Sequence, residues 1–148
     1  MPTQSEKKVL PYTADQMYAL ASDVLSYPDF LPWISAARIR SRKDMIDYEL
    51  IEADLVISFK VFRERFGSTA KLSPEAKTIE MKYLDGPFKY LDSSWGFRDL
   101  DDGRCEVSFF IDFEFKNAIL QKLIGVVFNE AIRRTMRAFE DRAKVLYG

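Results

Sequence analysis

Residues 105–128 read CEVSFFIDFEFKNAILQKLIGVVF, and the hydrophobic pattern changes its period in the middle of this stretch. Up to Phe115 apolar and polar residues alternate, with Phe110 as the one interruption. This period of two predicts a strand with one apolar and one mostly polar face. From Ala118 to about Leu146 apolar residues recur every three to five positions, which predicts a helix of about 28 residues, near 42 Å at roughly 1.5 Å per residue. Such a helix needs an apolar sheet face to cover it.

Six segments upstream also have the composition of strands, and short turn-like sequences separate several of them. They are residues 4–10, 37–42, 46–53, 58–72, 78–84 and 89–99. Consecutive strands with short turns predict an antiparallel meander. Thr13 and Gln16 have the spacing of a capping box and predict a short helix after the first strand. We therefore expect an α+β fold in which a curved antiparallel sheet of about seven strands wraps a long C-terminal helix, with short helices after the first strand.

The composition limits the classes of function. The chain has 148 residues and no linker-like stretch, so we expect a single domain over residues 1–148. Its 22 basic and 23 acidic residues give no net-charge argument for nucleic acid, and we expect no DNA partner. The absence of histidine removes imidazole-dependent triads and histidine metal sites, and the single Cys105 excludes an intramolecular disulfide. We expect no metal and no cofactor.

The hydrophobic pattern along the chain predicts where in the cell the protein is found. No signal peptide and no run of about 18 apolar residues is present, so we expect a cytoplasmic protein. Such a protein can touch a membrane but does not cross one. Peripheral contact with the inner membrane stays open as an alternative.

Two apolar stretches exceed what a simple core requires. YPDFLPWI, residues 27–34, contains two prolines and cannot form one continuous helix or strand. The first part of the last helix, AILQKLIGVVF at residues 118–128, has eight apolar residues in eleven, more than one sheet-facing stripe needs. A bound lipid, a membrane surface, a partner chain or the 27–34 segment could cover it. An apolar cleft between sheet and helix is a common ligand site.

Charged residues leave alternatives open. Glu64 shares a strand face with Phe62 and Phe66, so it is either a polar handle in an aromatic wall or half of an ion pair at the sheet rim. Arginines share one side of a predicted strand and recur on the last helix, where they form either a solvated surface or a phosphate or RNA contact. The strand arginines are Arg38, Arg40 and Arg42. No glycine-rich phosphate loop or metal motif is present.

Five stretches occur together and in order: YPDFLPW (27–33), FRERFGSTAKL (62–72), DGPFKYLDSSWGF (85–97), VSFFIDFEF (107–115) and AFEDRAKVLYG (138–148). In this combination the chain resembles the coenzyme Q-binding START-domain family, within the polyketide cyclase/dehydrase-like helix-grip superfamily. The resemblance implies a helix-grip fold and a non-enzymatic lipid chaperone that binds a polyprenyl quinone, ubiquinone, in an apolar cavity. Such a protein would support respiratory electron transfer or quinone biosynthesis.

We expect residues from the first four of these stretches and from residues 118–128 to line the quinone site. They are Tyr27, Phe30, Pro32, Trp33, Phe62, Phe66, Trp95, Phe113, Leu123, Val127 and Phe128.

Two further hypotheses remain. A bacterial branch of the family resembles a ribosome-association toxin, so the chain could be a ribosome-associated regulator that uses Arg38, Arg40, Arg42 and the basic helix face. A polyketide cyclase-like enzyme would need acid or base groups inside the cavity, and without histidine only Glu64, Tyr48 or Tyr90 could supply them.

Overall fold

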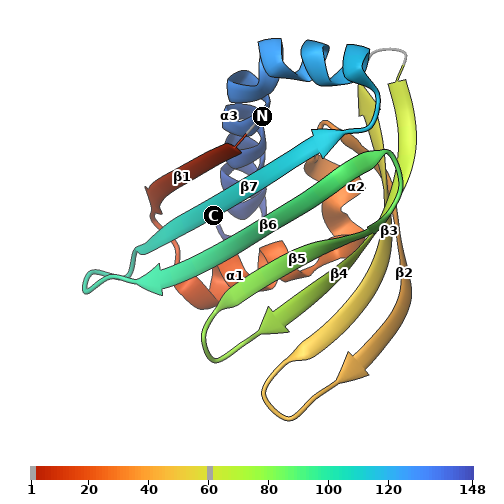
Figure 1. The fold of residues 1–148 in the computed structure, drawn as a ribbon. Coiled ribbons are helices and arrows are strands. Elements are labelled where there is room, and N and C mark those ends of the chain that lie inside the picture. The colour runs from red at the N-terminus through yellow and green to blue at the C-terminus, as the bar shows by residue number, and fades with distance from the viewer. Residues whose placement is uncertain (1–2, 60–61) are drawn as a thin grey trace.

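Seven strands form one antiparallel sheet in the order β1-β7-β6-β5-β4-β3-β2 (Figure 1). The computed structural model describes residues 3–59 and 62–148, with side chains except at residues 3, 59, 62 and 127–129. The strands are β1 (Thr3–Leu10), β2 (Ile34–Asp44), β3 (Glu49–Phe59), β4 (Phe62–Ser73), β5 (Thr78–Asp85), β6 (Phe88–Asp99) and β7 (Cys105–Phe115). The helices are α1 (Ala14–Ser22), the 3-10 turn η1 (Val24–Ser26), α2 (Tyr27–Phe30) and α3 (Ala118–Tyr147).

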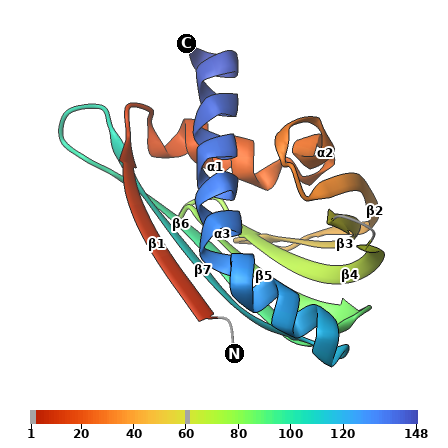
Figure 2. The same cartoon turned by 90° about the horizontal axis from the view of Figure 1, so that it is seen from above.

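The sheet curves, and all helices lie on its concave side (Figure 2). The predicted capping box is present, because the Thr13 hydroxyl accepts a hydrogen bond from the Gln16 backbone while the Gln16 side chain accepts one from the Thr13 backbone. Asn117 caps α3 by accepting from the amides of Ile119 and Leu120. The expected α+β helix-grip fold, with a sheet wrapped on a long C-terminal helix, is confirmed.

Three strands differ from the sequence-based expectation by more than one residue. The stretch 58–72 is not one strand, because β3 runs to Phe59 and β4 begins at Phe62. The strand expected at 46–53 starts later, since a turn closed by the Met45 amide donating to the Tyr48 carbonyl precedes Glu49. The strand expected from residue 37 already begins at Ile34, directly after the proline-containing segment.

The 27–34 segment combines a short helix with the start of a strand. Pro28 lies in the first turn of α2, where a missing amide hydrogen costs nothing. Tyr27 and Leu31 are buried, and the Tyr27 ring packs edge-on against Phe139 of α3. Pro28 therefore lies at the start of a helix, Pro32 lies between that helix and β2, and the aromatic residues around them turn inward.

Aromatic residues of β6, β7 and α3 form the centre of the core. Trp95 and Phe109 face each other across the β6–β7 pair with ring centroids 4.5 Å apart. Phe139 packs on Trp95 at 4.7 Å. The alternation predicted for residues 105–115 places Val107, Phe109 and Phe113 inward, so the long helix is covered by the sheet as expected.

Candidate functional site: an apolar cavity and an outer arginine–aspartate cluster

A cavity of about 220 Å³ lies between α3 and the concave face of the sheet. Aromatic side chains from the strands make up much of its wall: Phe66, Phe88, Trp95, Phe109, Phe113 and Phe115. The helix contributes Ile124, Ile132 and Phe139, and the 27–34 segment contributes Tyr27, Leu31, Trp33 and Ile34. Alternation along each strand explains the composition, since every second residue of a half-buried strand points to the same apolar side.

The opening of the cavity can be located from the exposure of its lining. Most wall residues on β6 and β7 are buried, whereas Ile34 and Ile57 of the β2–β3 edge are only partly covered. Ile124 and Ala131 of α3 are also partly covered. Partly covered lining residues therefore lie on both the first half of α3 and the β2–β3 edge of the sheet, and we infer that the cavity opens between these elements.

The polar groups in the described part of the wall are few and uncharged. The Tyr27 hydroxyl donates a hydrogen bond to the Ala21 carbonyl, and the Thr135 hydroxyl donates to the Ala131 carbonyl at 2.9 Å. Burial, with a smaller effect of Asp23, raises the pKa of Tyr27 well above its ordinary value, so its proton stays in place at physiological pH. Ser93, on β6, adds a further hydroxyl-bearing side chain. This wall can position a ligand but offers no group suited to acid or base chemistry.

The structure brings together five of the residues expected at the site, namely Tyr27, Trp33, Phe66, Trp95 and Phe113. Three others are placed elsewhere. Phe30 packs on Phe139 at 5.1 Å beneath the Arg142 guanidinium, Pro32 is exposed, and the Leu123 side chain is 52% exposed on the outer side of α3. The remaining three, Phe62, Val127 and Phe128, have side chains outside the described ones.

Several lining residues are not among those expected at the site. Phe88, Phe109 and Phe139 all contribute to the wall. Phe109 lies on the same strand face as Phe113, and Phe139 lies on the inward stripe of the last helix, so both could have been found from periodicity. Phe88 directly follows the Gly86-Pro87 turn and gave no periodic signal.

The candidate acid and base residues do not reach the cavity. Glu64 is exposed opposite Ile57, which favours its interpretation as a rim residue. Tyr90 donates to the Asp112 carboxylate at 3.3 Å, and Tyr48 lies under the Lys71 ammonium group at 4.6 Å from its ring centre. None of the three belongs to the described wall.

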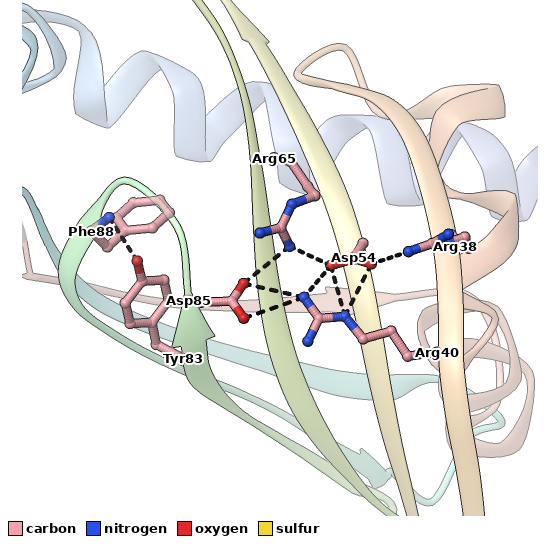
Figure 3. Close-up of polar contacts among 7 residues, drawn as sticks. All are labelled: Arg38, Arg40, Asp54, Arg65, Tyr83, Asp85 and Phe88. Atoms are coloured by element: carbon pink, nitrogen blue, oxygen red, sulfur yellow. Dashed lines mark hydrogen bonds and ion pairs between the residues drawn. The ribbon is translucent and has the colours of Figure 1, made fainter.

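A second polar feature occupies the outer face of the sheet (Figure 3). We call it the outer cluster: Arg38, Arg40, Asp54, Arg65 and Asp85. Asp54 is only 6% exposed because three guanidinium groups cover it, with the shortest contacts at 2.5 Å from Arg65 and 2.6 Å from Arg40. These hydrogen bonds, led by that from Arg40, hold the pKa of Asp54 well below its usual range.

Gly67 leaves the space in which the outer cluster forms. It pairs with Asp54 across the β3–β4 ladder, and a β-carbon added there would lie 2.6 Å from Nη2 of Arg40 and 2.8 Å from Oδ1 of Asp85.

Two of the three arginines expected to form a phosphate-binding surface, Arg38 and Arg40, already bind aspartate, and Arg42 lies near Glu49 at 3.5 Å. Arg38 still keeps 77% of its side chain exposed.

A curved antiparallel sheet gripping a long C-terminal helix, with an apolar cavity between them, defines the helix-grip, or START-like, class of fold. The chain belongs to the family described as polyketide cyclase / dehydrase and lipid transport, whose family model matches residues 10–140.

Among curated relatives, ribosome association toxin RatA of Escherichia coli K12 is 36% identical over 147 residues, covering 99% of this chain and 90% of the relative. Coenzyme Q-binding protein COQ10 homolog B of Xenopus laevis is 32% identical and covers 97% of this chain but 59% of the relative. The solution structure of the 18 kDa protein CC1736 from Caulobacter crescentus shares the fold with a TM-score of 0.84, 34% identity, and coverage of 100% of this chain and 99% of that one.

Neither a membrane-spanning helix nor a cluster of metal-ligating side chains is found among the described residues. No helix among them is long and apolar enough to span a membrane. No group of three or more histidine, cysteine, aspartate or glutamate residues among them is arranged to hold a metal ion.

Proposed function

We propose that the protein binds a single apolar molecule in its cavity and performs no chemistry on it. The observation that carries the proposal is the wall itself, which presents aromatic and aliphatic side chains and no charged group among its described members. An empty space of this size is costly, and it exceeds the roughly 150 Å³ cavity that suffices to bind benzene. A ligand that fills it recovers about 2.5 kcal/mol for each 100 Å² of apolar surface removed from water.

A polyprenyl quinone is the ligand class that we propose. A flat ring can pack against the aromatic side chains of Trp95, Phe109 and Phe113, and the hydroxyl of Ser93 lies in the same wall to meet one of its oxygens. The volume of about 220 Å³ accommodates a ring and the beginning of a chain. A long isoprenoid tail would then leave through the opening beside α3.

Lipid extraction tests this proposal. Purified protein is extracted with organic solvent, and the extract is analysed by mass spectrometry for prenyl quinones, followed by titration of the delipidated protein with quinone. We expect a co-purifying quinone, or micromolar or tighter binding of added quinone. Trp33→Ala should reduce retention of the quinone more than it lowers the stability of the protein. If retention and stability fell together, Trp33 would be an ordinary core residue. Absence of co-purified quinone together with no binding of added quinone would overturn the proposal.

Association with the ribosome is the second candidate, and the names of the relatives favour it over quinone binding. The RatA proteins match over nearly their full length at 36% identity for Escherichia coli and 39% for Rickettsia prowazekii. The quinone-binding relative matches at 32%. The exposed guanidinium groups of Arg38 and Arg65 in the outer cluster would supply phosphate contacts.

Cosedimentation with ribosomal subunits at physiological salt decides between the two candidates. A ribosome-associated protein should sediment with one subunit, and Arg38→Ala should weaken this association and reduce its dependence on salt. Quinone binding alone predicts no sedimentation. The cyclase alternative receives no support from the cavity, because Glu64, Tyr48 and Tyr90 all lie away from its described wall.

A further inference from the structure

The first turns of α3 are apolar on two sides. On the inner side Leu120 is buried and Ile124 lines the cavity. On the outer side Ile119, Leu123 and Val126 are 74%, 52% and 82% exposed. Their spacing of four and three residues places them on one helical face, which we call the α3 docking face. The middle turns of the same helix instead expose charged side chains, as an ordinary solvated helix does: Arg133, Arg134 and Arg137.

The charges beside the α3 docking face along the chain have a single sign. Between Glu114 and Glu130 the sequence carries Lys116 and Lys122 and no acidic residue. Both lysines are exposed. Glu114 is bound by Lys89 at 2.7 Å, and Glu130 by Arg133 and Arg134 at 3.1 Å each. A helix segment with an exposed apolar face, flanking lysines and no free carboxylate matches the surface of an anionic lipid bilayer.

The α3 docking face lies directly beside the opening of the cavity. Ile124 lines the cavity while its neighbour Leu123 points outward. The first turns of α3 also run at an angle to the rest of the helix, across the end of the sheet (Figures 1 and 2). An apolar molecule moving between a bilayer and the cavity along this segment would cross little water.

We propose that Ile119, Leu123 and Val126 insert reversibly into the interface of an anionic bilayer, with Lys116 and Lys122 facing the lipid headgroups. The choice of a membrane as partner rests on the proposed binding of an apolar ligand, because a lipid held in the cavity has to be taken from and returned to a lipid phase. Insertion of three side chains gives weak, reversible docking on the bilayer, which suits exchange of the ligand with the membrane better than permanent anchoring does.

Vesicle flotation tests the proposal. Full-length protein is mixed with vesicles of phosphatidylcholine alone or of phosphatidylcholine with phosphatidylglycerol, and the bound fraction is measured. We expect binding to the anionic vesicles, reduced about tenfold by Leu123→Gln or Val126→Gln because each removes a side chain that would enter the apolar layer. Lys122→Glu should reduce binding to the anionic vesicles by at least about fivefold, since each lysine near such a surface contributes about 1 kcal/mol.

Val145→Gln is the matched control. Val145 is 75% exposed on the same helix but at its far end, so its substitution should leave vesicle binding unchanged. Equal losses in this control and in Val126→Gln would overturn the assignment of the face. Unchanged thermal unfolding of all variants shows that they fold.

Two other outcomes would also overturn the docking proposal. One is the absence of vesicle binding by the wild-type protein, and in that case quinone recovered by extraction would leave the proposed ligand binding intact. The other is a homodimer in solution that Leu123→Gln converts to a monomer, because a second copy would then cover the face. Vesicle binding without any recoverable or titratable quinone would instead keep the docking face and overturn the ligand.

Discussion

Replacing Ser93 by leucine should separate a ligand cavity from an ordinary core. Ser93 lies on β6 between Met81 of β5 and Ile111 of β7, and all three side chains line the cavity. The substitution exchanges a hydroxyl for three carbon atoms that point into the empty space. At about 0.8 kcal/mol per buried methylene, the added carbons contribute about 2 kcal/mol to the stability of the ligand-free protein. For a chain of this size that corresponds to an increase of about 4–8 °C in Tm.

The same substitution should weaken quinone binding, because the leucine occupies volume that the ring needs. Stability and ligand affinity therefore change in opposite directions. Thermal unfolding of the delipidated protein and quinone titration by intrinsic Trp fluorescence measure the two quantities on one sample. Ser94→Leu, one residue along the strand and on its other face, is the matched control and should leave quinone affinity unchanged.

Two results would refute this reasoning. If Ser93→Leu bound quinone as tightly as the wild type, the ligand would not occupy the cavity. If it lowered Tm by several degrees, the wall could not accept three more carbons, and the space would be too tightly bounded to serve as a site.

The remaining predictions concern stability and reactivity. Asp54→Asn should cost about 1–3 kcal/mol at pH 7 by urea unfolding, the lower values reflecting the solvent exposure of its partners. The folded-state pKa of Asp54 is depressed, so the stabilisation that its ionised carboxylate gives is present above its unfolded-state pKa of about 4 and is lost as pH falls. The free energies of unfolding of wild type and variant should therefore converge towards pH 2, and a constant difference between them would contradict this. Gly86→Ala should destabilise the protein by more than about 1 kcal/mol, because φ at this residue is +135° and the new β-carbon would lie 2.8 Å from Cβ of Phe66. Gly125→Ala should instead stabilise it by up to about 1 kcal/mol, because Gly125 lies in a helix with open space around it. Burial raises the pKa of Cys105 to about 11, so a thiol reagent at pH 8 should label it only on unfolding, and rapid labelling of the folded protein would count against its burial.

Much of the fold could be predicted because local signals agree with the tertiary structure. The capping box at Thr13 and Gln16, the alternation of residues 105–115 and the helical period after Ala118 each appear in the structure as expected. The break between β3 and β4 could not be predicted, because the stretch from Ile57 to Glu64 contains no glycine, proline, asparagine or aspartate to indicate a turn.

Part of the candidate site could likewise be predicted from the sequence, and part could not. Residues that point inward by strand period, such as Phe66 and Phe113, could be assigned to a cavity wall from the sequence. The role of Asp54 could not, because its partners lie on β2, β4 and the end of β5 and are brought to it only by strand register. A sequence shows that arginines share a face but does not show which carboxylate of a neighbouring strand lies beside them. Leu123 was misplaced for a related reason, since period alone does not distinguish the two apolar sides of a helix.

The pairing of β1 with β7 has a consequence for how the chain folds. Every other pair of neighbouring strands is also consecutive in sequence, so β2 to β7 can form by successive local hairpins. β1 instead pairs from Thr3↔Asp112 to Leu10↔Cys105, across nearly the whole length of the meander. Closing a loop of that length carries a high entropic cost and slows folding. During synthesis the first strand made is thus the last to find its place, and the sheet is completed only after β7 has left the ribosomal tunnel.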